Sequence, residues 1–192
     1  MGNGNKFLKS VLSCEKRFSC HRYDGRGRHD FEVLEGKIPV MISAPHAVNH
    51  CRDGRIKYAD KLTGGIAIFL HKVTGCFKIA KNMQITTAYD PNYTPNPNGE
   101  NLYQSYLAEY VKNKHIEVLI DLHGAQEKRD FAVEIGTAPA LDEDGSPIQY
   151  GHPSLNGRDY IADLVTYMFE YTLRGVHQPA EKKKVAVNQV FC

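Results

Sequence analysis

The sequence has no Cys-x-x-Cys pair, no long apolar run and no marked excess of charge. Its five cysteines are scattered and odd in number, so neither a thiolate zinc cluster nor a redox pair is indicated. No apolar run approaches the ~18 residues of a membrane-spanning helix, and the amino terminus lacks the apolar core of a signal peptide. These absences predict a cytoplasmic protein with reduced thiols and no membrane partner.

The charge balance gives no sign of a nucleic-acid partner. The net charge is only +2. The one dense basic run, at residues 181–184, has no aromatic side chains interleaved with it, so we interpret it as a solvated segment. We expect no nucleic-acid binding.

Apolar periodicity predicts an α/β fold. The 192 residues are enough for one domain with a substantial core. Strands are predicted at residues 31–34, 38–44, 77–80, 83–87, 116–122, 130–136 and 185–190, and helices at 5–14, 59–74, 100–113 and 157–174. This alternation predicts a single α/β domain with a mixed, largely parallel sheet flanked by helices. We divide the chain into an N-terminal helix and polar loop (1–30) and an α/β domain (31–192).

Three details of this prediction concern particular segments. Residues 31–34 are expected to lead through a tight turn into the strand at 38–44. The strand at 116–122 is apolar enough to be buried on both faces. The pair Gly64 and Gly65 inside the helix at 59–74 indicates either close packing on the sheet or backbone room for a ligand.

Two predicted strands each end in a histidine. The strand at 116–122 ends in Asp121, Leu122, His123 and Gly124, and the strand at 38–44 is followed by Pro45 and His46. Side chains alternate along a strand, so Asp121 and His123 point to the same side, and Asp121 can accept a hydrogen bond from a histidine ring. Open α/β sheets bind ligands at this carboxyl end. We therefore predict a metal site containing His46 and His123.

A catalytic zinc ion usually has three protein ligands and one exchangeable water. Asp60, near the start of the helix at 59–74, is the preferred third ligand. The alternative for this residue is a carboxylate that only stabilises the helix start. His50 is the second choice, although we expect it to be exposed or hydrogen-bonded within its own loop.

Several short motifs resemble those of the N-formylglutamate amidohydrolase family, whose fold is similar to that of zinc carboxypeptidases. The resemblance covers about residues 37–192. It rests on Ser43-Ala44-Pro45-His46, Tyr58-Ala59-Asp60, Asp90-Pro91-Asn92, Asp121-Leu122-His123-Gly124 and Glu134-Ile135-Gly136-Thr137. It implies a hydrolase with one zinc ion held by His46, Asp60 and His123. The implied substrate is an N-acyl (formyl-type) amino acid or a short peptide-like amide.

The sequence departs from the family pattern at two points. Family members continue past a segment like residues 188–191 into a late strand that bears a glutamate general base, whereas this chain stops at Cys192. Three explanations are open: the domain lacks those strands, Glu134 acts as the general base instead, or the protein is not catalytic. The family's Asn-Arg substrate clamp is incomplete, because Asn92 is followed by Tyr93.

Two further residues are candidates for catalysis or substrate binding, and two alternative functions are open. Glu134, on the strand after His123, is the candidate base, and Arg129 is a candidate for binding a substrate carboxylate. The alternative for each is an ordinary exposed side chain. The alternative functions are a non-catalytic metal- or ligand-binding domain and a metallophosphoesterase-like hydrolase, although the Gly-Asp and Asn-His-Glu/Asp motifs of the latter are missing.

Overall fold

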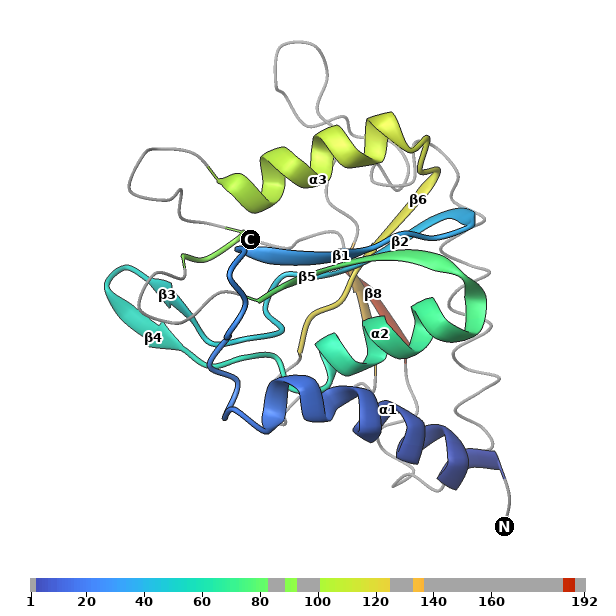
Figure 1. Cartoon of the computed structure of the whole chain (residues 1–192), viewed down its shortest axis with the longest axis horizontal. Coiled ribbons are helices and arrows are strands. Elements are labelled where there is room, and N and C mark those ends of the chain that lie inside the picture. The colour runs from blue at the N-terminus through green and yellow to red at the C-terminus, as the bar shows by residue number, and fades with distance from the viewer. Residues whose placement is uncertain (1–2, 83–88, 93–100, 125–132, 137–184, 189–192) are drawn as a thin grey trace. The chain divides into compact units, whose positions relative to one another are not determined.

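A four-stranded sheet organises the first of two compact units, Met1–Gly124 and Ala125–Cys192 (Figure 1). The structure is a computed structural model, and it describes residues 3–82, 89–92, 101–124, 133–136 and 185–188. The strands of the sheet, in spatial order, are β1 (Phe31–Leu34), β5 (Cys76–Lys81), β2 (Ile38–Ala44) and β6 (Val118–Asp121). A small hairpin of β3 (His50–Arg52) and β4 (Arg55–Lys57) extends from it.

The sheet is mixed and mostly parallel. Strand β2 pairs in parallel with β5 on one side and with β6 on the other, whereas β1 pairs antiparallel with β5. The predicted α/β class is therefore confirmed at this level. The expectation that residues 31–34 turn directly into a neighbouring strand is wrong, because β5 lies between β1 and β2.

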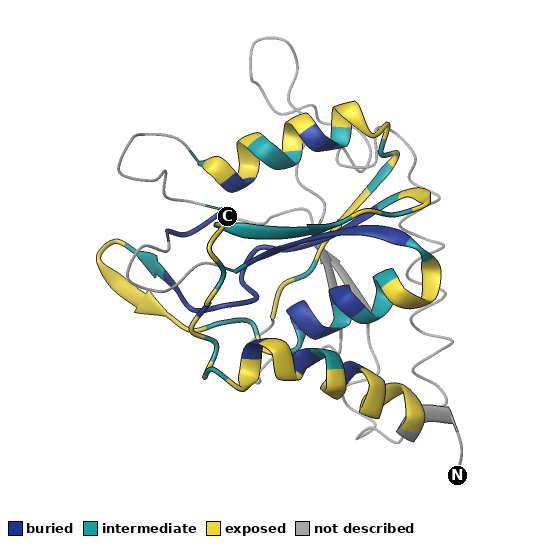
Figure 2. Ribbon diagram, in the orientation of Figure 1, coloured by how far each residue is buried: buried dark blue, intermediate teal, exposed yellow. Residues whose placement is uncertain are grey.

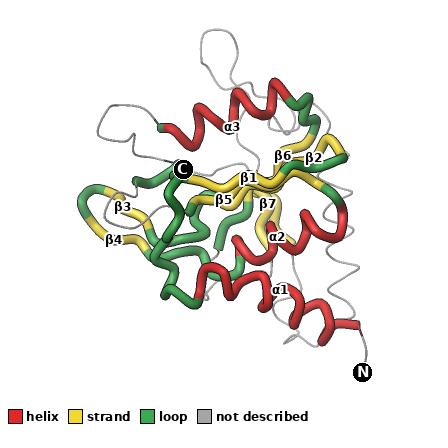
Figure 3. The backbone as a smooth tube through the Cα atoms, viewed as in Figure 1, coloured by secondary structure: helices red, strands yellow, loops and turns green. Residues whose placement is uncertain are grey.

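Helices cover both faces of this sheet (Figures 1 and 3). Helix α2 (Thr63–Thr74) packs on one face with α1 (Asn3–Ser19) outside it, and α3 (Leu102–Asn113) covers the other face. Alternation along β2 supplies both cores: Ile42 joins the cluster with Ala67 of α2, and its neighbour Met41 joins the cluster with Tyr103 of α3. Figure 2 shows the resulting burial of the central strands.

Local signals explain where the helices begin and end. Asn101 caps α3, because its side chain accepts a hydrogen bond from the backbone N–H of Gln104 at 3.1 Å. Gly75 ends α2 in the left-handed conformation with φ 74°, as the sequence predicts. Helix α1 continues to Ser19, beyond the predicted 5–14.

Strand β5 is buried along its whole length, including two lysines. The Lys78 ammonium pairs with Glu32 at 3.0 Å, and the Lys81 ammonium pairs with Asp30. Both lysine side chains are fully buried, so these carboxylates are needed to compensate their charge. Strand β1, which follows Asp30 and contains Glu32, thereby anchors the edge of the sheet.

The two glycines of α2 lie in close contact with α1. A Cβ at Gly64 would lie 2.5 Å from the Phe18 ring, and one at Gly65 would lie 2.6 Å from the carboxylate of Glu15. Neither expectation for this pair, packing on the sheet or room for a ligand, describes that contact. The glycines let the N-terminal helix approach α2 closely.

The strand that leads to His123 is more exposed than predicted. Strand β6 lies at the edge of the sheet, and Leu119 and Ile120 are 44% and 43% exposed. Burial on both faces is therefore wrong for this strand. In the second unit, β7 (Val133–Gly136) pairs in parallel with β8 (Val185–Asn188). The predicted helix at 157–174 and the predicted strand at 83–87 lie outside the described residues.

Candidate metal centre

His46 stands at the carboxyl end of β2, where Pro45 ends the strand. Its side chain is only 8% exposed. The backbone turns there because Ala47 donates a hydrogen bond to the carbonyl of Ala44 at 3.3 Å. The imidazole is therefore held at the mouth of the sheet.

His123 reaches the same place from β6. The parallel pairing of β2 and β6 continues one residue beyond the strand, because Leu122 donates its N–H to the carbonyl of Ser43 at 2.8 Å. This register places the His123 ring 5.0 Å from that of His46, centroid to centroid. The two strand-end histidines predicted from the sequence do meet.

Asp60 enters from the other direction, just before α2. Its N–H donates to the carbonyl of His46 at 2.9 Å, and its own carbonyl accepts hydrogen bonds from the N–H and hydroxyl of Thr63 at 3.2 and 2.7 Å. The backbone of Asp60 is thus fixed on both sides. Its carboxylate lies between the two histidines.

The two distances from Asp60 to the histidines match those of a tetrahedral metal site. Oδ2 of Asp60 lies 3.4 Å from Nδ1 of His46 and 3.4 Å from Nδ1 of His123. Ligand atoms ~2.0–2.1 Å from a zinc ion in a tetrahedron are about 3.3–3.4 Å apart. With all three ligand atoms within 4.8 Å of one another, these side chains could hold a metal ion.

Each histidine also forms a hydrogen bond to a second carboxylate through its other ring nitrogen. Nε2 of His46 donates to Oδ1 of Asp90 at 3.1 Å, and Nε2 of His123 donates to Oδ2 of Asp121 at 3.1 Å. A ring that donates from Nε2 keeps the lone pair of Nδ1 for a metal. The expected pairing of Asp121 with a histidine ring is present.

A second group, His46, His50 and Asp90, could also hold a metal ion, and all three of its members are buried. Asp90 accepts from the N–H of Asn92 at 2.9 Å and is ion-paired with Arg52, besides its bond to His46. A carboxylate with this many donors has little capacity left for a cation, and the guanidinium would repel one. The geometry therefore favours the group with Asp60 and His123.

His50 matches only one part of its prediction. It is only 3% exposed and stacks on His46, with ring centroids 4.3 Å apart and an interplanar angle of 9°. Its Nε2 lies 3.5 Å from Oδ2 of Asp90 and has no hydrogen-bond partner within the described part of the chain. His50 is therefore not exposed, but the other alternative holds, because its Nδ1 is hydrogen-bonded to the carbonyl of Val48 in its own loop at 3.4 Å.

The surroundings of this centre stabilise the charged form of its carboxylates. Burial would raise the pKa of Asp60, but hydrogen bonds from His123 and His46 and from the N–H of Gly124 bring it well below its usual range. Burial would lower the pKa of His123, but Asp121 and Asp60 outweigh it and raise that pKa to about 9. The pKa of His46 is raised for the same reason, with Asp60 and Asp90 opposing burial. Without a metal ion, these carboxylates therefore favour the protonated form of both histidines, and a metal ion bound at Nδ1 would take the place of the proton that each ring shares with Asp60.

The remaining predicted residues are placed differently. Asn92 does reach the centre, with its side-chain nitrogen 3.2 Å from Nε2 of His123. Arg129 lies outside the described residues. Glu134 lies on β7 in the second unit, and its roles as base or as exposed carboxylate stay predictions.

The sequence did not indicate the ion pair of Arg52 with Asp90, and it did not show that Asp90 contacts a histidine. Arg52 is six residues from His46 on β3, but Asp90 is 44 residues away along the chain. The triplet Asp90-Pro91-Asn92 was the only signal, and it came from a resemblance to a family. No local periodicity indicates which histidine such a carboxylate will meet.

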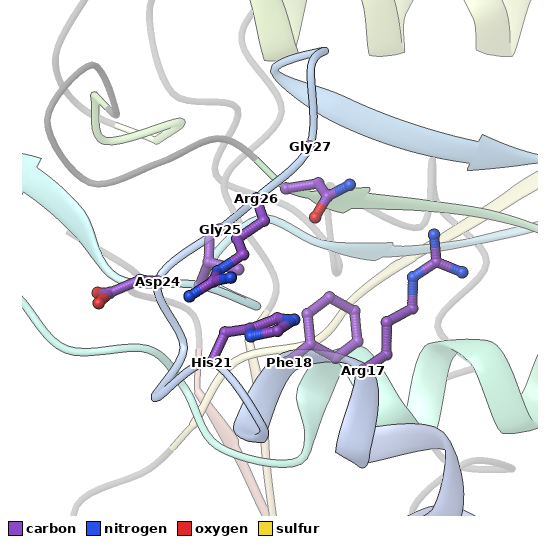
Figure 4. A pocket seen from close by; sticks show the side chains of 9 residues that line it. Arg17, Phe18, His21, Asp24, Gly25, Arg26 and Gly27 are labelled. Atoms are coloured by element: carbon purple, nitrogen blue, oxygen red, sulfur yellow. The ribbon is translucent and has the colours of Figure 1, made fainter.

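A cavity of about 260 Å³ lies where the end of α1 meets residues 21–27 (Figure 4). Arg17, Phe18, His21 and Arg26 line it, together with Val48. None of the candidate metal ligands lines this cavity. The cavity is therefore separate from the candidate metal centre.

Comparisons with models of known families, with curated protein sequences and with solved structures gave no match for this chain. Among the residues that the structure describes, no helix is both long and apolar enough to span a membrane.

Proposed function

We propose that this protein is a zinc-dependent amidohydrolase that cleaves an N-acyl amino acid or a similar amide. The observation that carries the proposal is the position of Asp60, whose Oδ2 lies 3.4 Å from Nδ1 of both histidines. Three donors at this spacing, contributed by three separate segments, are costly to bring together without a ligand, because each loses solvation.

The donor types favour zinc. Two imidazole nitrogens and one carboxylate oxygen form a set used by catalytic zinc sites, which leave the fourth position for water or substrate. A magnesium or calcium site would instead be built mainly from oxygen donors. The carboxylates of Asp90 and Asp121 hold the imidazoles in the tautomer that presents Nδ1.

Access to the centre is one-sided. The side chain of His46 is 8% exposed, whereas those of Asp60 and His123 are 23% and 27% exposed. A substrate therefore approaches from the side of Asp60 and His123, and His50 and Asp90 close the opposite side. One closed and one open side is the arrangement of a catalytic metal site rather than of a structural one.

A bound zinc ion would supply a Lewis acid for the scissile carbonyl and would lower the pKa of its water. The chain must then supply a base that takes the water's proton and passes it to the leaving nitrogen. We propose Glu134 for this role and Arg129 for binding a substrate carboxylate through its planar fork. We propose a substrate contact for Asn92 as well, because its side-chain nitrogen lies 3.2 Å from Nε2 of His123.

The substrate class and the carboxypeptidase-like fold rest on the resemblance to N-formylglutamate amidohydrolases. That resemblance implies the same three ligands that converge here. The implied product pair is an acid and an amino acid, formed when water adds across the amide bond.

Zinc content and amide hydrolysis should be measured on one preparation of the full chain. Formyl- and acetyl-amino acids are the test substrates, and a phosphate ester is the comparison for phosphoesterase chemistry. His123→Ala should lose both zinc and amide hydrolysis, whereas the control His29→Ala, at an exposed position, should keep both. Zinc binding without amide hydrolysis in wild type would favour the non-catalytic alternative, and hydrolysis of the ester alone would favour the phosphoesterase alternative.

A further inference from the structure

Helix α2 begins with a strained residue. Leu62, immediately before the helix, has φ 74° and ψ −17°, in the left-handed region that non-glycine residues avoid. Its side chain makes no capping hydrogen bond to the helix. Asp60, the candidate ligand, lies only two residues earlier. Strain of this kind persists only where the surroundings enforce it.

Glu15 of α1 supplies the missing cap from a distant part of the chain. Its Oε1 accepts a hydrogen bond from the N–H of Leu62 at 2.8 Å, and its Oε2 accepts one from the N–H of Gly65 at 2.7 Å. Glu15 is only 3% exposed. A carboxylate at a helix N-terminus satisfies unpaired N–H groups and interacts favourably with the helix dipole.

The first turn of α2 connects this carboxylate to the metal centre. Thr63, next to Leu62, holds the carbonyl of Asp60 through its N–H and its hydroxyl, at 3.2 and 2.7 Å. The N–H of Asp60 in turn holds the carbonyl of His46 at 2.9 Å. A change in the conformation at Leu62 would therefore move Asp60 relative to His46.

We propose that Glu15 is a positioning residue of the metal centre. It holds Leu62 in the left-handed conformation, and the resulting bend places the carboxylate of Asp60 between His46 and His123. This inference rests on the proposed metal site and goes beyond it, because it makes the N-terminal helix a part of the site. Residues 1–30 are therefore needed for metal affinity.

The test is the affinity of the full chain for Zn²⁺, measured by competition with a chelator at a temperature where every variant is folded. Glu15→Gln keeps the volume of the side chain but replaces one acceptor oxygen with a donor, so one of the two N–H groups loses its partner. We expect zinc affinity to fall about tenfold, in the range of other residues that orient metal ligands. The matched control is Glu35→Gln, which weakens the ion pair with Lys114 at the end of α3, away from α1, and should leave zinc affinity unchanged.

A pair of double variants distinguishes positioning from general destabilisation. Glycine adopts the left-handed conformation without strain, whereas alanine does not. Glu15→Gln combined with Leu62→Gly should therefore recover most of the wild-type affinity. Glu15→Gln combined with Leu62→Ala, which loses similar packing, should not.

Each failure has a distinct meaning. Unchanged affinity in Glu15→Gln would overturn this inference alone, and so would equal affinity of the glycine and alanine double variants. Absence of zinc binding in wild type would contradict the proposed function and, with it, this inference.

Discussion

The imidazole of His46 and the carboxylate of Asp90 are joined by a hydrogen bond of 3.1 Å from Nε2 to Oδ1. This bond leaves Nδ1 of His46 facing Asp60, which is 3.4 Å away on the other side of the ring. One imidazole thus lies between the buried carboxylate of Asp90 and the carboxylate of Asp60, the other candidate ligand. At His123 the corresponding hydrogen bond goes to Asp121, whose carboxylate is 42% exposed.

Asp90→Asn should weaken zinc binding roughly 10–100-fold, because the neutral amide is a poorer acceptor for Nε2 of His46. The measurement is chelator competition with the purified variant. Asp121→Asn serves as the comparison. Its effect should be smaller, since the Asp121 side chain is 42% exposed and water can replace it, whereas Asp90 is fully buried. A larger loss in Asp121→Asn would contradict this account of the two carboxylates.

The sequence was sufficient to predict the three side chains that converge. A strand that ends in a histidine places that residue at the edge of the sheet, and two parallel neighbours bring their ends together. His46 and His123 could be paired on this basis. Asp60 was the preferred third ligand as a carboxylate near the start of the predicted helix at 59–74, with His50 as the second choice.

Contacts between distant segments could not be predicted. The bonds of Glu15 to Leu62 and Gly65 join residues 47 and 50 positions apart, and neither partner belongs to a local motif. The burial of His50 likewise depends on Asp90 and on stacking with His46. Periodicity shows which face of a helix or strand is buried, but it does not show which element packs against it. The position of β5 between β1 and β2 could therefore not be predicted.

Gly65→Ala should reduce the free energy of unfolding by about 1–3 kcal/mol, the usual cost of overpacking. The added Cβ would lie 2.6 Å from the Glu15 carboxylate, and this clash outweighs the better helix propensity of alanine. Urea unfolding measures the loss.

Zinc affinity should fall in the same variant, because Glu15 is displaced. The control is Gly54→Ala, where the surroundings are open but φ is +70°. It should lower stability through backbone strain and leave zinc affinity unchanged. Equal zinc affinity in the two variants would contradict the role of α1 at the centre.

Tyr23 should make stability depend on pH in the alkaline range. Burial, a hydrogen bond to Glu15 and the charge of Glu15 raise the pKa of Tyr23 to about 12. The unfolded chain releases this proton near pH 10. The native state therefore holds an extra proton above that pH, and the contribution of Tyr23 to stability, complete below pH 10, is lost as the pH rises toward 12.

Urea unfolding of wild type and Tyr23→Phe across pH 9 to 12 would isolate this contribution, since other tyrosines and the buried lysines titrate in both proteins. The difference in unfolding free energy between the two should be constant below the pKa of the unfolded tyrosine, near 10, and should shrink above it. A constant difference over the whole range would show that the Tyr23 proton is not held by folding.

Glu134→Gln tests whether the chain contains its own base. General base assistance is typically worth about 10²–10⁴ in rate, so kcat/KM on formyl- and acetyl-amino acids should fall at least tenfold if Glu134 acts in this way. Zinc content should stay unchanged. A smaller loss in an active preparation would exclude Glu134 as the base, and no activity in either protein would favour a metal-binding domain.

The most direct test of the central claim is the zinc content and zinc affinity of wild type beside single alanine variants of His46, Asp60, His123 and His50. Wild type should bind one zinc ion, and the first three variants should lose it or bind it far more weakly. His50→Ala should retain it, because His50 supports His46 from behind. Unchanged zinc in His123→Ala would contradict the metal centre, and loss in His50→Ala with retention in Asp60→Ala would show that the third ligand is His50.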